Sequence, residues 1–138
     1  MDRILSREAP EMEKYDERDQ WKVAVTGISS GCGISFLTGC MARYLANTGK
    51  HSPAVVELGK GSFYDSFGMD KRFAGRTWTS FYSALLERQN IRGRKNMDEG
   101  INWVIRSPEE VNIRLTFEQQ LRLVNNARGD VVLSDLSA

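Results

Sequence analysis

One stretch of this sequence, residues 21–46, constrains the fold more than any other. Lys22 to Thr26 is a short run rich in β-branched residues, which predicts a buried strand. A turn of small residues runs from Gly27 to Gly33, and helical spacing begins at about Ile34. In such a strand–turn–helix unit, backbone N–H groups and the helix N-terminus hold phosphate, and glycine allows close approach. The stretch predicts either a phosphate site or a tight turn that packs a helix onto a sheet.

The turn departs from the regular phosphate-binding loop at two positions. That loop ends Gly-Lys-Ser/Thr, whereas this one reads Gly33-Ile34-Ser35, so an apolar side chain replaces the ammonium group that would contact the β- and γ-phosphates. The regular spacing also requires glycine at position 28, which is isoleucine here. Ser35 stands where a hydroxyl would reach a magnesium ion. The motif is therefore incomplete as a pattern.

Length and composition are typical of a globular protein with one domain. The 138 residues are enough for one domain with a hydrophobic core, and a net charge of +1 gives no argument for general affinity for nucleic acid or membrane. No apolar run approaches membrane-spanning length, and two cysteines make no disulfide framework, so we expect a cytoplasmic protein. Residues 1–20 carry seven acidic and four basic side chains, which predicts a charged flexible leader outside the folded part at 21–138.

The rest of the chain alternates predicted strands and helices. Further strands are predicted at Pro53 to Leu58, Ile101 to Ile105 and Val131 to Asp135. Helices are predicted from Ile34 to the stop at Asn47-Thr48-Gly49, from Thr77 to Leu86, and after Thr116, which has capping-box spacing to Gln119. Gly59 to Arg76 carries aromatic residues without a clear period. The order β-α-β-α-β-α-β predicts an α/β fold with a parallel sheet and flanking helices.

Helical spacing also predicts which residues of each helix share a face. The three predicted apolar faces are Phe36, Leu37, Cys40, Met41, Tyr44 and Leu45; then Trp78, Phe81, Tyr82 and Leu85; then Phe117, Leu121, Val124 and Ala127. On the first helix, the small residues Gly39 and Ala42 would allow close approach to a sheet.

Three of these features should meet at one edge of the sheet. Ligands of parallel sheets bind at the carboxyl ends of the strands. The turn after the first strand, Glu57 at the end of the second and Asp135 at the end of the last all lie there. This convergence favours a phosphate-type site. For Glu57, a structural alternative is a strand-end carboxylate whose partners are the amides of the glycine turn.

On these residues the sequence resembles the MinD/ParA family of P-loop ATPases, over about residues 21–138. The matching parts are the loop Ser29-Ser30-Gly31-Cys32-Gly33-Ile34-Ser35, the strand ending Val56-Glu57-Leu58-Gly59 and the last strand from Gly129 to Asp135. The resemblance implies a P-loop NTPase-like fold of the SIMIBI type. It implies ATP or ADP bound by Ser29, Ser30, Gly31, Cys32, Gly33, Ile34 and Ser35, with Mg²⁺ held by Ser35 and, through water, by Asp135. A site that holds no nucleotide is the alternative.

The departures from the family concern charge. Ser29 replaces the family lysine that reaches across a dimer interface, Ile34 replaces the P-loop lysine, and Glu57 and Gly59 replace two aspartates. The resemblance therefore implies a degenerate Walker A motif with weak or absent ATP hydrolysis. Relatives with eroded loops act as localisation factors, so we expect a nucleotide-responsive positioning or assembly factor of partition, pilus or secretion type. A nucleotide-free scaffold, or an ATPase completed by a partner or by Lys60, stays open.

The resemblance also predicts an incomplete sheet. Members of the family continue past the last carboxylate, so residues 21–138 match the N-terminal part of the domain, and we expect a fragment of a longer protein. The Lys22 to Thr26 strand should pair with the Val131 strand on one side only, which predicts that the chain by itself is either poorly soluble or self-associated through the open edge. We expect a protein partner or a homodimer, and membrane association only through partners. Nucleic-acid binding stays open, since seven basic residues could form a patch: Lys71, Arg72, Arg76, Arg88, Arg92, Arg94 and Lys95.

Overall fold

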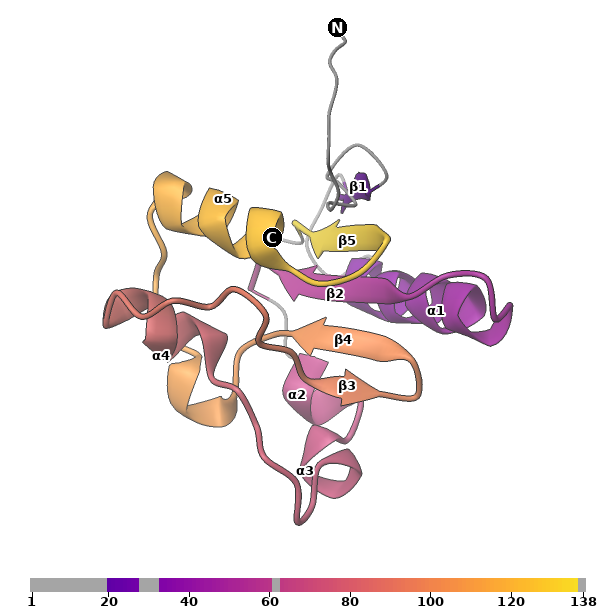
Figure 1. Cartoon of the computed structure of the whole chain (residues 1–138), viewed down its shortest axis with the longest axis horizontal. Coiled ribbons are helices and arrows are strands. Elements are labelled where there is room, and N and C mark those ends of the chain that lie inside the picture. The colour runs from indigo at the N-terminus through magenta and orange to yellow at the C-terminus, as the bar shows by residue number, and fades with distance from the viewer. Residues whose placement is uncertain (1–19, 28–32, 61–62, 137–138) are drawn as a thin grey trace, which may run out of the picture.

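The computed structural model describes residues 20–27, 33–60 and 63–136, which form a five-stranded sheet with helices on both faces (Figure 1). The strands are β1 (Trp21–Val25), β2 (Pro53–Glu57), β3 (Met97–Asp98), β4 (Ile101–Val104) and β5 (Val131–Asp135). The helices are α1 (Ile34–Asn47), α2 (Phe63–Ser66), α3 (Met69–Arg72), α4 (Phe81–Leu86) and α5 (Phe117–Asn126), with a 3-10 turn, η2, at Pro108–Glu110. Within the described part of the chain, no helix is long and apolar enough to cross a membrane.

The strand order is β1-β5-β2-β4-β3, which Figure 1 shows from the top of the view to the bottom. The first four strands in this order are parallel, and β3 is antiparallel to β4. The predicted α/β fold with a parallel sheet is therefore confirmed. The short β3 was not predicted. It forms a hairpin with β4 through Glu99 and Gly100, whose φ angles of 52° and 82° suit a tight hairpin turn.

The strand β1 lies at the edge of the sheet, as the predicted order requires. It pairs in parallel with β5, from Trp21 opposite Val131 to Val25 opposite Asp135. Among the described residues it has no second neighbour. The prediction that this strand is buried is wrong, since only Val25 is buried and Trp21 is 72% exposed. By contrast, β2 lies between β5 and β4 and every one of its residues is buried.

The core has two layers, one on each face of the sheet. On the face covered by α1, Val55, Trp103 and Leu133 of the strands pack with Ala42 of α1 and with the segment from α2 to Phe73. On the other face, strand residues such as Val56 and Val132 pack with α4 and α5. Alternate residues of β2 and β5 thus point to opposite layers, as a sheet covered on both faces requires.

The predicted apolar face of α1 is confirmed only in part, since Met41 and Leu45 pack against the core while the other members of that face are exposed. Phe36 and Tyr44 are 70% and 71% exposed, whereas the buried residues are Thr38, Gly39 and Ala42. The small residues decide the orientation because they let the helix approach the sheet and α2. A Cβ atom on Gly39 would lie 2.1 Å from Cζ of Phe67, so only glycine leaves room for that ring. The expectation that Gly39 and Ala42 allow close approach is confirmed.

The predicted face of α5 is likewise confirmed only in part, since Val124 packs against the core. Phe117 is 74% exposed and Leu121 is 45% exposed, while Leu123 is buried and packs against the sheet. Ala127, which follows the helix, is buried as predicted. The capping box is confirmed: the Gln119 N–H donates to Thr116 Oγ1 at 3.1 Å, and the Thr116 N–H donates to Gln119 Oε1 at 2.8 Å.

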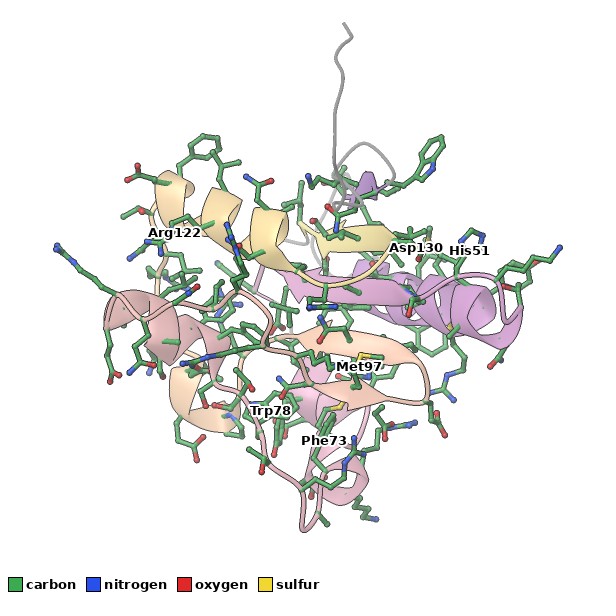
Figure 2. All side chains as sticks on the ribbon, viewed as in Figure 1. His51, Phe73, Trp78, Met97, Arg122 and Asp130 are labelled. Carbon is green, nitrogen blue, oxygen red and sulfur yellow. The ribbon has the colours of Figure 1, made fainter. Side chains whose placement is uncertain are left out.

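Two further segments differ from prediction. The helix predicted from Thr77 to Leu86 begins only at Phe81, as α4, because Asn96 holds Thr79 in a non-helical conformation through bonds to its N–H (2.7 Å) and its carbonyl (3.0 Å). The segment between Gly59 and Arg76 contains α2 and α3 instead of a plain loop. Its aromatics fold back onto the core, where Phe73 meets Trp78 edge-on with ring centroids 4.9 Å apart (Figure 2).

Candidate phosphate-binding site

The carboxyl ends of β1, β5, β2 and β4 form one edge, because these four strands are parallel. The helix α1 begins at this edge, directly after Gly33, whose φ of 82° is a left-handed conformation that favours glycine. Four of the predicted nucleotide contacts, Ser29, Ser30, Gly31 and Cys32, lie outside the described residues and stay predictions. Gly33, Ile34 and Ser35 are the predicted loop residues that the structure describes.

The two predicted magnesium ligands lie in direct contact. Ser35 Oγ, in the first turn of α1, donates a hydrogen bond of 2.6 Å to Asp135 Oδ2 at the end of β5. These residues are one hundred positions apart in the chain, so only the fold brings them together. A hydroxyl and a carboxylate are hard oxygen ligands of the kind that Mg²⁺ binds, and the pair fits such an ion. The described residues contain no group of three or more His, Cys, Asp or Glu that could hold a metal, so phosphate and water would complete its shell.

Asp135 also connects the end of β5 to the turn after β2. Its backbone carbonyl accepts hydrogen bonds from the N–H groups of Leu58 (3.0 Å) and Gly59 (2.9 Å). Glu57 is the register partner of Asp135 on the neighbouring strand. The two carboxylate-bearing residues are therefore held at the same level of the sheet, as the sequence predicted.

Glu57 is completely buried at the end of β2. Its Oε1 accepts the N–H of Arg106 at 2.8 Å, and its Oε2 accepts the N–H of Phe63 at 3.4 Å. Its described partners are thus the residues after β4 and at the start of α2, rather than the glycine turn. Burial raises the pKa of Glu57 to about 7, although the two N–H donors and the Arg106 charge oppose the shift.

Arg106 belongs to this site and was not predicted. Its Nη1 donates to the Gly59 carbonyl at 2.6 Å and lies 3.9 Å from Glu57 Oε1. Its guanidinium lies 4.4 Å from the centre of the Tyr82 ring, and its Nε is buried with no partner among the described residues. A signal was present in the sequence, since Arg106 directly follows a predicted strand and precedes Ser107-Pro108. The sequence alone does not single out Arg106, because one basic residue after a strand matches no phosphate-binding motif.

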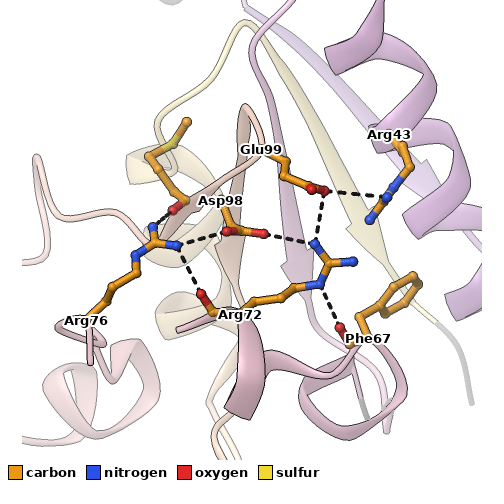
Figure 3. Close-up of polar contacts among 7 residues, drawn as sticks. Arg43, Phe67, Arg72, Arg76, Asp98 and Glu99 are labelled. Atoms are coloured by element: carbon orange, nitrogen blue, oxygen red, sulfur yellow. Dashed lines mark hydrogen bonds and ion pairs between the residues drawn. The ribbon is translucent and has the colours of Figure 1, made fainter. Parts of the chain in front are cut away.

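The predicted basic patch is partly neutralised. Arg72 Nη1 contacts Asp98 Oδ2 and Glu99 Oε1, each at 3.0 Å, and Arg76 Nη1 contacts Asp98 Oδ1 at 2.9 Å (Figure 3). Arg43 of α1 also reaches Glu99, at 3.5 Å. These ion pairs connect α1, α3 and the β3–β4 hairpin. Two of the seven cations in the patch are therefore in ion pairs with carboxylates of the hairpin.

The lone histidine also has a carboxylate partner. His51 Nδ1 lies 3.0 Å from Asp130 Oδ2, next to the start of β2 and β5 (Figure 2). Asp130 also accepts the Ser52 N–H, at 2.7 Å. This pair lies at the amino ends of the strands, opposite to the candidate site.

Comparison with known proteins agrees with this geometry at the level of the fold. No family model and no curated protein matches the sequence. Among solved structures, a ParA family ATPase from Chlorobium tepidum TLS is similar, with a TM-score of 0.58 and 15% sequence identity. The similarity covers 86% of this chain and 52% of that one, so the chain spans about half the length of the ATPase. This protein thus has the α/β fold of a ParA-type P-loop ATPase over most of its described length.

Proposed function

We propose that this chain is a degenerate MinD/ParA-like P-loop domain that binds ATP or ADP weakly and hydrolyses it little or not at all. It would act as a nucleotide-responsive positioning or assembly factor through a protein partner. The observation that carries the proposal is the 2.6 Å contact between Ser35 and Asp135, which places a helix-start hydroxyl against a strand-end carboxylate. Such an oxygen pair next to a helix N-terminus suits a magnesium-bound phosphate.

Weak turnover follows from the charges that this site lacks. Ile34 is partly buried in the first turn of α1, where the family has a lysine. Losing a cation beside a triphosphate removes charge-assisted contacts of about 1.5–3 kcal/mol each and removes stabilisation of the transition state. Arg106 does not replace it, because its guanidinium is engaged with Gly59, Glu57 and the Tyr82 ring.

Hydrolysis is the first test. We expect phosphate release from magnesium ATP at the background rate for the chain and for the Asp135→Ala variant alike. A rate above background that Asp135→Ala abolishes would contradict the inactive form of the proposal. It would favour an active ATPase that takes its cation from a partner or from Lys60, which is exposed after Gly59.

Binding is the second test, by calorimetry with ATP and ADP in the presence of Mg²⁺. The unmodified chain should bind weakly, and Ser35→Ala should weaken binding further because it removes the proposed magnesium ligand. Ile34→Lys should strengthen binding by roughly tenfold, which corresponds to about 1.4 kcal/mol from one restored cation. Unchanged affinity in Ile34→Lys would show that the loop does not have the phosphate-binding shape.

A nucleotide-free scaffold is the second candidate. It is favoured by Arg106, the buried cation of the site, being bound to the protein's own Glu57 and Gly59. In that case neither heat nor a thermal shift would be seen with either nucleotide, for the unmodified chain and for Ile34→Lys.

A further inference from the structure

The face of the molecule formed by α4, α5 and their neighbouring loops carries exposed cations that have no carboxylate partner among the described residues. They lie in the loop after α4, in the segment before α5, on α5 and just after it. These residues, the basic face, are Arg88, Arg92, Arg94, Lys95, Arg114, Arg122 and Arg128. The same segments carry only two carboxylates, Glu87 and Glu118, so this face is net basic. On the opposite side of the sheet, Arg72 and Arg76 are in ion pairs with the hairpin.

Asn102, which is completely buried in β4, joins two segments of the basic face. Its Oδ1 accepts the N–H of Asn96, the residue after Lys95, at 2.9 Å. Its Nδ2 donates to the carbonyl of Arg128 at 3.1 Å. Ile91 of the same loop packs in the core cluster that includes α5. The basic loop and the C-terminal end of α5 are therefore adjacent, although they are far apart in the sequence.

The chain enters the fold at the same place. Gln20 donates through Nε2 to the carbonyls of Ala127, at 3.1 Å, and Gly129, at 2.9 Å, which are the two neighbours of Arg128. The part of the chain before Gln20 therefore starts beside the basic face. The twelve residues 8–19, directly before this point, carry six acidic and two basic side chains, which gives a net charge of −4.

We propose that the acidic segment at residues 8–19 binds the basic face of its own chain and covers it. The charges are opposite in sign, and the described residues offer these cations no carboxylate partners of their own. Twelve extended residues reach about 40 Å, whereas the ten residues of α5 span about 15 Å. The segment is therefore long enough to pass from Arg128 to the loop after α4.

The tether at Gln20 favours this segment over a free polyanion as the occupant. A tethered segment has an effective concentration in the millimolar range, so surface ion pairs that are individually weak suffice to hold it. Another acidic peptide or a nucleic acid would then bind the basic face only by displacing residues 8–19. The inference does not rest on the proposed nucleotide site, because no residue of the basic face belongs to that site.

Carbodiimide coupling of the full chain tests the contact directly, because Lys95 is the one amine among the seven cations. In the monomer fraction, mass spectrometry should find residues 8–19 linked to Lys95. The link to Lys71, an exposed amine of α3, should be much weaker. Arg128→Gln should lower the Lys95 yield by roughly twofold, because it weakens the attraction of the face for the segment.

The matched control for Arg128→Gln is Lys71→Gln, which also removes one exposed charge but lies on the other side of the sheet. It should leave the Lys95 yield unchanged. High salt should suppress the Lys95 link, since exposed charges are screened. Circular dichroism checks that each variant is folded.

A short duplex DNA probe tests whether residues 8–19 occupy the basic face. Glu13→Gln combined with Glu17→Gln weakens the segment and should raise the affinity of the full chain for the duplex. The control is Asp65→Asn combined with Asp70→Asn, which removes the same charge from exposed positions on α2 and α3. The affinity should rise roughly threefold more in the first variant, because only that variant uncovers the face.

Two results would overturn the proposal. One is a Lys95 link that is no stronger than the Lys71 link, or one that Arg128→Gln leaves unchanged. The other is equal affinity for the duplex in the Glu13→Gln, Glu17→Gln variant and in its control. That result would show that the basic face is free in the full chain and open to nucleic acid.

Discussion

The two edges of the sheet differ in how far they are covered. At the β4 end, Trp103 is buried under Phe63 and Phe67, the hairpin adds β3, and ion pairs tie the hairpin to α1 and α3. At the β1 end, Trp21 is 72% exposed and the described residues provide no further strand. The same sheet therefore has one closed end and one open end.

The difference teaches how a sheet edge becomes closed. The closed end is built by segments near one another in sequence, from Phe63 to Val104, whose aromatics and short hairpin cover the edge locally. At the open end, β1 pairs with a strand more than a hundred residues away, and its second edge is left with unpaired backbone groups. Such an edge is a template for association. The predictions below test this contrast, from the largest expected effect on stability to the smallest.

The largest difference in stability should come from replacing the tryptophan at each end of the sheet by alanine. Trp103→Ala should lower the free energy of unfolding by about 3–5 kcal/mol, because it leaves a cavity under Phe63 and Phe67. Trp21→Ala, at the exposed end, should change it by less than about 0.5 kcal/mol. Urea denaturation of both variants measures the two changes in the free energy of unfolding. Equal losses would show that Trp21 is covered in solution and that the two ends are not different.

The next effect concerns Glu57, whose Phe63 contact connects β2 to the closed end. Its pKa is raised from 4.5 to about 7, so the folded state binds the proton more tightly than the unfolded state. The protonated Glu57 carboxyl therefore stabilises the folded state fully below about pH 4.5. As the pH rises towards 7, this contribution is lost and the free energy of unfolding falls by about 3 kcal/mol.

Urea titrations at a series of pH values compare the chain with Glu57→Gln, which keeps an acceptor for the Arg106 N–H and cannot ionise. The Glu57→Gln variant should not lose stability as the pH rises. The control variant Glu118→Gln should still lose it, because Glu118 is an exposed carboxylate. Parallel curves for the chain and Glu57→Gln would contradict the raised pKa.

A smaller effect is expected from the ion pairs at the closed end. Asp98→Asn should cost about 1 kcal/mol, because Asp98 faces both Arg72 and Arg76 and its side chain is only 12% exposed. Glu99→Gln should lower the stability by less than Asp98→Asn does, since the Glu99 side chain is 60% exposed. Added salt should reduce the cost of both changes. Thermal denaturation at low and high salt would measure them, and a loss that does not depend on salt would assign Asp98 a role in packing instead of charge.

The smallest effect on stability is expected at the open edge, where the effect on association should be large. The Trp21 N–H donates to Asp130, and the Val25 carbonyl accepts from Leu136, so the Ala24 N–H faces away from β5. Proline is tolerated at such a position and prevents strand addition. Light scattering should show self-associated species for the unmodified chain and fewer or none for Ala24→Pro. A clean monomer for the unmodified chain would mean that the edge is covered from within.

Much of the candidate site could be predicted from the chain alone. Ser35, Glu57 and Asp135 were expected at one edge of the sheet, and the structure brings Ser35 to Asp135 and places Glu57 beside it in register. Arg106 could not be predicted as the partner of Glu57, because their contact depends on the order of β2 and β4 in the sheet. The parallel α/β fold could be predicted because strands and helices alternate along the chain, and its ParA-type arrangement was implied by the resemblance of the loop at 29–35 and of the last strand to that family.

The sequence by itself determined the order and type of the main elements, the capped start of α5 and the edge where the carboxylates meet. Each depends on local spacing or on the rule that parallel strands share their carboxyl ends. Only the tertiary structure decided which side of α1 and α5 is buried, since periodicity shows which residues share a face and not what packs against it. On α1 the contact surface selected Gly39 and Ala42 over Phe36 and Tyr44, because small residues allow the helix to lie close to the sheet and to the Phe67 ring.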